Sequence, residues 1–405
     1  MLNTFQQQRH PALPTASHDD NARQEFSKSL KQFVQDQLLP GLAPVYQRRA
    51  KKFAAEHGRE PKDRREVRKF MIGDPYFQSY ASTNRVAQEL LWESVIPSIQ
   101  RQQPSLNEAA TKLSAKNNAE LMIDAEMEVP RYISGIDIHC MPGGYAGSAS
   151  EQDVSTALLY DRGVYLYAMG YMGPMNDDLG RSVCNYIRRN LPGLKPLRIL
   201  DMGCTVGHST LPYKEFFPEA EVIGIDVAGP QVRYAHARAG GLGMDVSFQQ
   251  RDASDTDFEA ESFDLVVSHI LLHETSNKAM PAIFKECHRL LKPGGVMIHA
   301  DLPPFDRCDL FSEFILDNET HYNNEPFWGP MRDVDQIQLA IDAGFEKSNI
   351  SMDTAPMASM ELAAAAAAGY DPESASEVAQ REFEAGEFAP GGGWEVLIGH
   401  KKASS

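Results

Sequence analysis

The stretch Arg198-Ile-Leu-Asp-Met-Gly-Cys-Thr-Val-Gly-His-Ser-Thr210 decides the fold class of this chain. Its apolar run ends in Asp201, and Gly203 and Gly207 then form a turn that leads into an expected helix. Glycine lets the backbone turn tightly and approach a ligand closely. About 20 residues further on, a second apolar run ends in Asp226, which is the spacing of a nucleoside-binding βαβ unit. We therefore expect Asp226 to accept hydrogen bonds from ribose hydroxyls.

Strands and helices continue to alternate after Asp226. In chain order, the expected elements are a strand ending at Asp252 and Ala253, a buried strand over 262–269, a helix over 282–291, the turn Lys292-Pro-Gly-Gly295, and strands over 296–301 and 394–401. Such alternation is typical of an α/β protein with a mostly parallel sheet.

These segments together resemble the class I S-adenosylmethionine-dependent methyltransferases, in the branch whose small-molecule members carry LDxGCGxG, FDxVxxxxxLHH and LKPGG segments. The resemblance covers roughly residues 195–345 and returns at 394–401. It implies a Rossmann-like sheet of seven strands with helices on both faces and an antiparallel closing strand. Thr205 departs from the pattern, because the family has a glycine there. A dinucleotide-binding dehydrogenase, the main alternative, would carry Gly-x-Gly-x-x-Gly instead.

The resemblance also implies the cofactor, S-adenosyl-L-methionine, and the residues that hold it. Asp201 and Gly203 are expected at the methionine end, and Asp252 at the adenine amino group with the Ala253 backbone at the ring edge. His269 is expected near the sulfonium. For Tyr160, packing within a group of tyrosines is an equal alternative. The full predicted cofactor set is Asp201, Gly203, Cys204, Gly207, Asp226, Val227, Asp252, Ala253, His269 and Tyr160.

Two histidines, His269 and His273, follow the fourth strand of the methyltransferase pattern and are the candidate catalytic residues. His273 has the better position to act as a base or to orient an acceptor hydroxyl; packing or helix capping is the alternative. A base is needed only if the acceptor must lose a proton. No metal site is predicted, because His269 should still lie on the strand and the metalloprotease pattern places its glutamate between the histidines. His139 and Cys140 are interpreted as part of an ordered connector.

Two long segments leave the edge of the sheet at which ligands bind in such folds. The segment after Asp301 carries the predicted substrate wall of Tyr322, Asn323, Glu325 and Trp328, with a packed surface loop as the alternative. The segment over about 353–393 contains a run of alanines that favours a helix. It is interpreted as an insertion that is either a lid or a peripheral decoration.

The length of 405 residues suggests two or three domains. We expect a disordered lead-in over 1–22, a helical N-terminal domain over 23–150 and the methyltransferase domain over 151–405. Pro40 is expected to end one N-terminal helix, and Ser105-Leu-Asn-Glu108 to open another as a capping box. The N-terminal helices should cover part of the pocket or form a homodimer interface.

The composition excludes several classes of function. The formal net charge of −17 opposes binding to nucleic acid. Five cysteines without paired spacing argue against a disulfide framework. No apolar stretch reaches the length of about 18 residues that a membrane span needs. We therefore expect a cytoplasmic protein with no membrane partner.

The predicted function is transfer of a methyl group from S-adenosylmethionine to a small organic metabolite, at oxygen, nitrogen or carbon. One alternative is a protein or peptide methyltransferase that docks through its N-terminal helices. Its basic segment Arg48–Lys69 would then recruit an acidic partner. The other alternative is a non-catalytic relative that only binds the cofactor.

Overall fold

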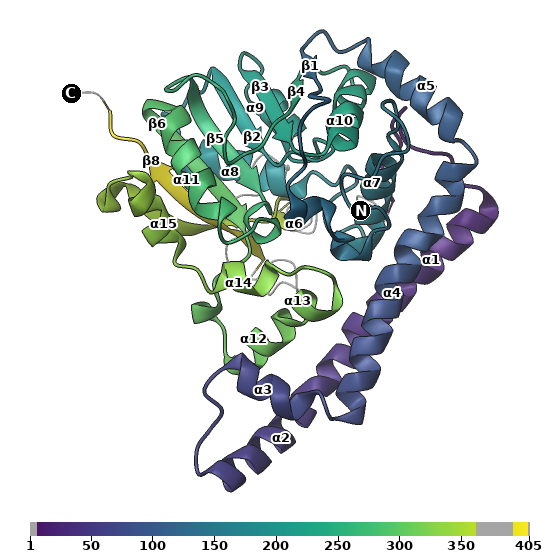
Figure 1. The fold of residues 1–405 in the computed structure, drawn as a ribbon, viewed down its shortest axis with the longest axis vertical. Coiled ribbons are helices and arrows are strands. Elements are labelled where there is room, and N and C mark those ends of the chain that lie inside the picture. The colour runs from purple at the N-terminus through teal and green to yellow at the C-terminus, as the bar shows by residue number, and fades with distance from the viewer. Residues whose placement is uncertain (1–5, 362–391, 404–405) are drawn as a thin grey trace.

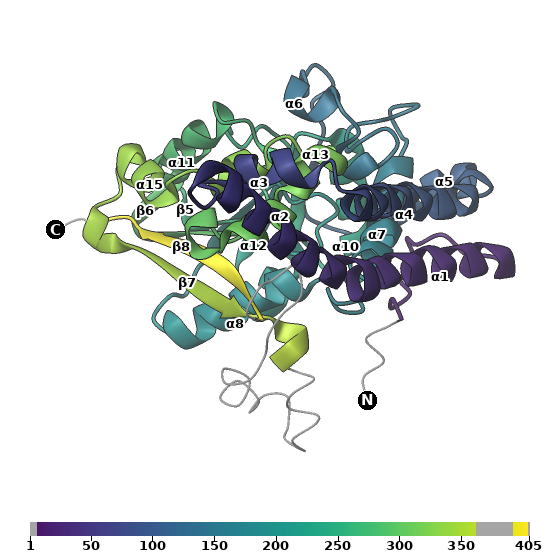
Figure 2. The ribbon, with the colours of Figure 1, turned by 90° about the horizontal axis from the view of Figure 1, so that it is seen from below.

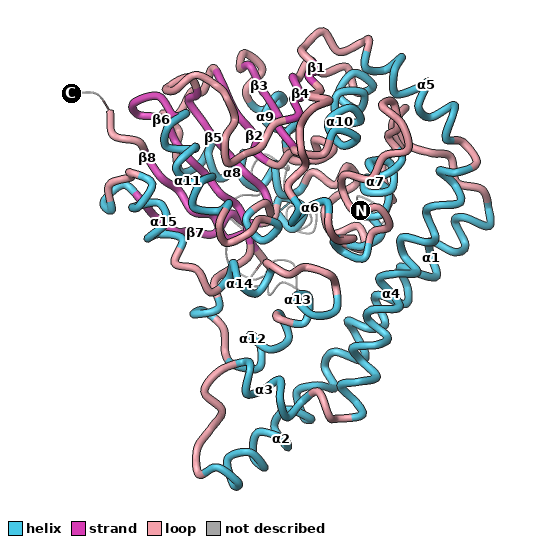
Figure 3. Tube along the Cα trace, viewed as in Figure 1, coloured by secondary structure: helices cyan, strands magenta, loops and turns pink. Residues whose placement is uncertain are grey.

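The computed structural model of the protein describes residues 6–361 and 392–403. Within them, the strands form one sheet that occupies one half of the molecule, as Figure 3 shows. The strands are β1 Leu121–Met122, β2 Arg198–Met202, β3 Glu221–Asp226, β4 Ser247–Gln250, β5 Phe263–His269, β6 Leu291–Asp301, β7 Ile350–Pro356 and β8 Gly393–His400.

The strand order is β1-β4-β3-β2-β5-β6-β8-β7. Neighbours from β1 to β6 are parallel, whereas β8 runs antiparallel to both β6 and β7. The Rossmann-like sheet and its antiparallel closing strand are thereby confirmed. The sheet exceeds the predicted seven strands by β1, a two-residue edge strand that pairs with β4.

The α-helices surround this sheet (Figure 1). They are α1 His18–Phe33, α2 Leu42–His57, α3 Arg64–Met71, α4 Pro75–Gln100, α5 Gln103–Ser114, α6 Arg131–Ser134, α7 Ser155–Tyr167, α8 Asp178–Asn190, α9 Thr210–Phe216, α10 Gly229–Gly241, α11 Ala279–Leu290, α12 Leu310–Leu316, α13 Asn318–Tyr322, α14 Trp328–Arg332 and α15 Gln336–Ala343. Short helical turns lie at Val34–Leu38, Leu39–Gly41, Ile138–Cys140, Leu272–Glu274, Phe305–Arg307 and Lys347–Asn349.

Helices cover both faces of the sheet because successive strand residues point to opposite sides. Ile199 of β2 packs in one buried cluster with Val183 of α8 and Val232 of α10. Its neighbour Leu200 packs in a different cluster with Phe284 of α11. Each face thus has its own apolar core, and only the strand ends remain for polar chemistry.

The N-terminal helices are continuous with the methyltransferase fold. Helices α1 and α4 run side by side as a long arm along one flank of the molecule (Figures 1 and 2). Trp92 of α4 and Leu113 of α5 belong to the same buried cluster as Tyr165 of α7 and Tyr234 of α10. The predicted domain boundary at residue 150 therefore divides one shared core.

The predicted disordered lead-in over 1–22 is wrong for the part that the structure describes. Helix α1 begins at His18, where Ser17 and Asp20 form a reciprocal capping box. Further upstream, Gln7 and His10 bind the buried Asp161 through side-chain contacts of 3.0 and 3.1 Å. Side-chain bonds of this kind order a segment that has little apolar content of its own.

Two predicted helix boundaries in the arm are also wrong. Pro40 lies in the short turn Leu39–Gly41 and the chain continues directly into α2, since proline at the start of a helical turn has no N–H bond to lose. The capping box at Ser105 does not form, because α5 already begins at Gln103.

The predicted insertion over 353–393 begins and ends within strands, since β7 extends to Pro356 and β8 starts at Gly393. Its alanine-rich part, 362–391, lies outside the described residues. Among the helices that are described, none has the length and apolar character needed to cross a membrane.

Candidate active site

A cavity lies at the carboxyl ends of β2, β3, β4 and β5, where an open parallel sheet is expected to bind ligands. Asp201, Asp226, Asp252 and His269 line it from the sheet. The segment between α5 and α8 covers it with four aromatic or basic side chains, Tyr132, His139, Tyr145 and Tyr160. Residues before the methyltransferase motifs thus form part of the cavity wall.

The turn after β2 approaches the cavity through its backbone. Gly203 has a φ of +75°, and a Cβ there would lie 2.6 Å from the Leu271 side chain, so only glycine fits. Thr205 adopts a φ of +43°, which is costly for a β-branched residue and explains why the family prefers glycine there. Gly207 does not line the cavity; a Cβ there would lie 2.9 Å from the Phe248 ring.

Asp226 has the geometry expected of a ribose ligand. Its Oδ1 accepts a hydrogen bond from the Ala228 N–H at 2.9 Å, and its Oδ2 accepts one from the Thr205 N–H at 3.0 Å. Each carboxylate oxygen has a further lone pair for a ligand hydroxyl. Burial raises the pKa of Asp226 to about 6, so the carboxylate is ionised at neutral pH.

The part of the cavity around Asp252 combines an acid with an aromatic ring. The Ser254 N–H and hydroxyl both donate to Asp252 Oδ1 at 2.7 Å, which fixes the orientation of that carboxylate. Ala253, Arg251 and Tyr132 line the same region. This set of an oriented acceptor, a backbone edge and a ring fits an adenine.

His269 lies in the cavity wall within a closed polar network. Its Nδ1 is 3.0 Å from Asp201 Oδ1, and its Nε2 is 2.9 Å from the Tyr213 hydroxyl. The Thr210 hydroxyl donates to the other oxygen of Asp201 at 2.5 Å. Because both ring nitrogens are engaged, His269 is suited to orienting Asp201 and not to removing a proton.

The structure does not bring His273 into the cavity. Its Nδ1 is 2.7 Å from Asp301 Oδ1, and its ring packs against the Trp328 ring at a centroid distance of 4.9 Å. Burial disfavours the imidazolium, but Asp301 outweighs this and raises the pKa of His273 to about 9. The predicted role of His273 as a base gains no support from this placement, whereas its neighbour Glu274 does line the cavity.

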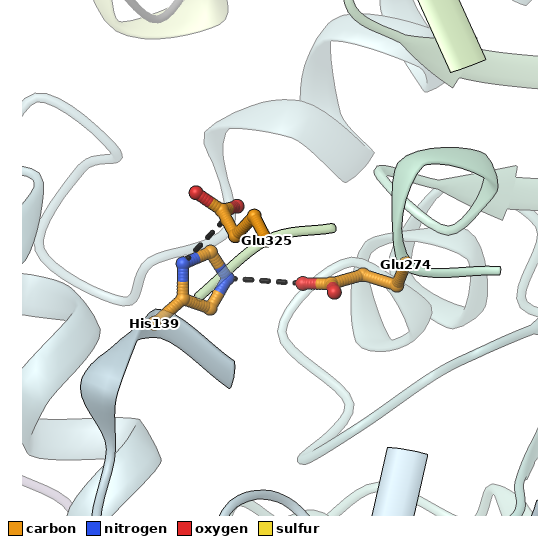
Figure 4. A group of neighbouring side chains, drawn as sticks. All are labelled: His139, Glu274 and Glu325. Carbon is orange, nitrogen blue, oxygen red and sulfur yellow. Dashed lines mark ion pairs between the residues drawn. The ribbon is translucent and has the colours of Figure 1, made fainter. Parts of the chain in front are cut away.

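Figure 4 shows the polar group at the end of the cavity beyond β5. His139 stands between two glutamates: its Nε2 is 3.0 Å from Glu274 Oε1 and its Nδ1 is 3.3 Å from Glu325 Oε1. The Tyr145 hydroxyl donates to Glu274 Oε1 at 3.0 Å, and Asn323 Nδ2 donates to Glu325 Oε2 at 2.9 Å. These five side chains come from three separate parts of the sequence.

The backbone of His139 is held in an unfavourable conformation, with a φ of 54° and a ψ of 19°. Its carbonyl oxygen accepts hydrogen bonds from Trp92 Nε1 at 2.7 Å and from Gln88 Nε2 at 3.0 Å. A left-handed conformation persists at a non-glycine residue only when its surroundings impose it, and such residues are concentrated at functional sites. Helix α4 therefore positions the His139 ring.

The predicted cofactor residues and the predicted substrate residues differ in whether they line the cavity. Every member of the predicted cofactor set lines the cavity except Gly207. None of the predicted substrate wall lines it: Tyr322 packs on Phe77 of the helical arm, Trp328 packs on His273, and Asn323 and Glu325 lie behind His139. Sequence reasoning missed the cavity-lining residues Tyr132, His139, Tyr145, Thr205, His208, Arg251 and Glu274.

Comparison with known proteins agrees with this geometry. Residues 199–295, which contain β2 to β5 and the acids at their ends, match the family described as a methyltransferase domain. This part of the chain is a methyltransferase domain of the S-adenosylmethionine-dependent class.

The chain is 30% identical to phosphoethanolamine N-methyltransferase 1 of Arabidopsis thaliana over 155 residues, which are 38% of this chain and 29% of the plant protein. It is 34% identical to the demethylmenaquinone methyltransferase of Thermus thermophilus over 27% of this chain and 49% of that protein. The chain therefore spans less than half the length of either relative.

A solved structure of phosphoethanolamine N-methyltransferase 2 from Haemonchus contortus, in complex with S-adenosyl-L-methionine, superposes with a TM-score of 0.42 at 16% identity. The superposition covers 63% of this chain and 58% of the nematode chain.

Proposed function

We propose that the protein transfers a methyl group from S-adenosylmethionine to a small organic acceptor. The observation that carries this proposal is one cavity with two chemically different ends. Asp226 and Asp252 line the nucleoside end, and His139 and Glu274 line the other end, with the tip of β5 between them. A methyl donor and an acceptor held in such a cavity can be aligned for in-line displacement.

The bound donor would supply an electrophilic methyl group. The residues of the chain would bind it, orient it and exclude water. Asp226 would accept both ribose hydroxyls, and Asp252 would accept from the adenine amino group. Asp201, oriented by His269 and Thr210, would hold the methionine end. The aromatic cover would keep water away from the reacting atoms.

The covering segment favours a small acceptor over a macromolecule. Tyr132, Tyr145 and Tyr160 close over the sheet end, so little of the cavity is open to a folded partner. The names of the two relatives reported above point to phosphoethanolamine and demethylmenaquinone, which are small molecules, as their acceptors.

The alternative of docking through the basic segment Arg48–Lys69 gains no support from its charge pairing. Arg48 and Arg49 pair with Asp74, and Arg59 pairs with Glu66. Arg64 pairs with Asp333 at 2.6 Å. These pairs neutralise part of the positive charge of the segment, which weakens its attraction for an acidic partner.

A screen with an isotopically labelled methyl donor tests the proposal. Purified protein, labelled S-adenosylmethionine and a small-molecule cell extract should give a labelled product of low mass, detected by mass spectrometry. Asp226→Ala should abolish the product, whereas the control Asp245→Ala, at an exposed carboxylate bonded to Asn118, should retain it. Absence of both transfer and calorimetric binding of S-adenosylhomocysteine would sink the proposal.

A homodimer through the N-terminal helices stays a prediction. Phe26 and Phe33 of α1 are 62% and 48% exposed, which is the kind of apolar surface that a partner copy would cover. Sedimentation velocity should give the mass of two chains, and a monomer at high micromolar concentration would refute it.

A further inference from the structure

The end of the cavity beyond β5 has more carboxylates than basic groups. Glu274 and Glu325 both contact His139. Glu319 lies close by and interacts with His139 and Lys31. Burial raises the pKa of Glu319 and that of Glu325, whereas His139 keeps Glu274 ionised. Glu274 is therefore the ionised carboxylate of this group that lines the cavity, and His273 is paired with Asp301.

His139 is not available to a ligand as a cation. Both of its ring nitrogens face carboxylate oxygens of the protein, one from Glu274 and one from Glu325 (Figure 4). Glu325 Oε1 lies 3.3 Å from the ring nitrogen but off the line of a hydrogen bond, and it is fully buried. The ring therefore serves as a bridge between two acids.

Glu274 has one oxygen left for a ligand. Its Oε1 takes the contacts of His139, of the Tyr145 hydroxyl and, at 3.8 Å, of His273. Among the described residues, no hydrogen bond reaches Oε2, and Glu274 lines the cavity. This oxygen is therefore free to accept a hydrogen bond from a donor group of whatever fills the cavity.

Aromatic rings surround the same space. Tyr145 and Tyr160 both line the cavity, with their ring centroids 5.6 Å apart in an edge-on arrangement. The negative face of an aromatic ring attracts a cation. Among the described residues that line the cavity, Arg251 is the one Lys or Arg side chain. It lies beside Asp252, at the proposed adenine end. The described lining residues near Glu274 thus include no Lys or Arg side chain that could receive a carboxylate or a phosphate.

We propose that the methyl acceptor is an amine, which binds as its ammonium ion with the nitrogen against Glu274, and that Glu274 is the base that prepares it for methylation. This inference rests on the proposed function. An ammonium ion brings a positive charge to the Glu274 carboxylate, donates to its free oxygen and can face the rings of Tyr145 and Tyr160. An alcohol can donate to that oxygen but brings no positive charge to the carboxylate or to the rings.

The reaction is balanced without a further reactant. Glu274 takes one proton from R–NH3+, which frees the nitrogen lone pair. The lone pair forms a bond to the methyl carbon while the carbon–sulfur bond breaks, and sulfur keeps that electron pair. The products are R–NH2–CH3+ and S-adenosylhomocysteine. The proton on Glu274 is then passed on or released to water.

His139 and Glu325 are positioning residues that tune this base. Burial opposes ionisation of Glu274, but the adjacent His139 lowers the pKa of Glu274 overall. Burial also disfavours the His139 imidazolium, but Glu325 and Glu274 raise the pKa of His139. Burial raises the pKa of Glu325 to about 7, so at neutral pH this acid is more readily protonated than Glu274.

A metal ion does not explain the group as well. The donor atoms of His139, Glu274 and Glu325 lie within 4.8 Å of one another, which suits a metal site in principle. However, the two glutamates face opposite nitrogens of one ring, and a single ion can bind only one of these nitrogens. Using all three ligands would require the ring to turn away from one carboxylate.

The labelled product of the screen described above tests the inference directly. Fragmentation should place the label on nitrogen. A label on oxygen or carbon would overturn the amine proposal and leave the methyltransferase proposal standing. Failure to bind S-adenosylhomocysteine, in contrast, would remove the methyltransferase proposal itself.

Glu274→Gln should lower kcat about 100-fold on the identified amine, as expected for loss of a base. Its affinity for S-adenosylhomocysteine should stay within about threefold. The matched control is Glu286→Gln, a buried glutamate outside the cavity that binds Thr256 and Arg289, and it should retain kcat. A Glu274→Gln variant that binds S-adenosylhomocysteine and turns over like the control would refute the assignment.

The variant Glu325→Gln tests whether Glu325 affects the pKa of Glu274 or only supports the structure around it. Without this carboxylate, His139 holds its proton less firmly and lowers the pKa of Glu274 less. The acidic limb of the pH–kcat profile should therefore move to higher pH, with the plateau retained. Lys31, Glu319, Tyr145 and the His273–Asp301 pair also face this group and stay unchanged in the variant. An unshifted profile would show that His139 does not tune the base.

Discussion

The strongest quantitative prediction concerns the loss of the Asp226 carboxylate. In the structure it already accepts two backbone N–H groups, from Thr205 and Ala228, and is expected to accept two ribose hydroxyls. A hydrogen bond to a charged group contributes about 1.5–3 kcal/mol. Removing both ligand bonds through Asp226→Ala should therefore cost at least about 3 kcal/mol, or about 100-fold in Kd.

Comparison with Asp252→Ala tests whether Asp226 binds the ribose and Asp252 the adenine, or the reverse. One Asp252 oxygen is already used by the Ser254 N–H and hydroxyl, and the other is expected to take a single adenine N–H. Its loss should cost about 1.5 kcal/mol, or about tenfold in Kd. Isothermal titration of S-adenosylhomocysteine at pH 7.5 measures both, with Asp245→Ala as the surface control.

The same carboxylate should make cofactor binding depend on pH. Because burial raises the pKa of Asp226 to about 6, the group becomes protonated as the pH falls below that value. A protonated carboxyl accepts ribose hydroxyls poorly, so affinity should fall about tenfold for each pH unit below 6. A pH-independent Kd between pH 7.5 and 5, or greater damage from Asp252→Ala, would refute the placement of the ribose.

Three further predictions concern stability. Gly203→Ala should destabilise the fold by about 2 kcal/mol or more through strain and contact with Leu271, whereas Thr205→Gly should be tolerated; thermal unfolding distinguishes the two variants. The raised pKa of His273 should contribute about 3 kcal/mol to the free energy of unfolding below pH 6.5, and this contribution should be lost as the pH rises through about 9. The free energies of urea unfolding at pH 6.5 and at pH 9.5 should therefore differ less in His273→Gln than in the unchanged protein. Asp161→Asn should cost about 3 kcal/mol in urea unfolding, because it breaks buried contacts with two histidines; a loss below 1 kcal/mol would contradict this.

The cofactor half of the site could be predicted from sequence because its signals are local. An apolar run followed at once by an acid places Asp201 and Asp226 at strand ends whatever the rest of the chain does. The edge strand β1 was not predictable in this way. It has two residues, and it exists because Leu121 finds a partner in Phe248 more than a hundred positions away.

The acceptor half was missed for a related reason. His139, Glu274 and Glu325 lie far apart in the sequence, and only the fold joins them. The pair His273 and Glu274 shows a second limit. These neighbours share one helical turn, yet His273 points to Asp301 and Glu274 points into the cavity, and no sequence pattern distinguishes the two directions.

The helical arm supports the proposed acceptor end of the cavity, whereas the nucleoside end comes from the segment with the methyltransferase motifs. The segment that matches the methyltransferase family, 199–295, supplies the nucleoside end of the cavity. The acceptor end depends on His139, which keeps its strained backbone only because Trp92 and Gln88 of α4 hold its carbonyl oxygen. Trp92 is 1% exposed and belongs to the core that α4 shares with α7 and α10. If the acceptor binds at Glu274 as proposed, the packing of the arm influences acceptor choice through His139, and changes in the arm should alter that choice without changing cofactor affinity.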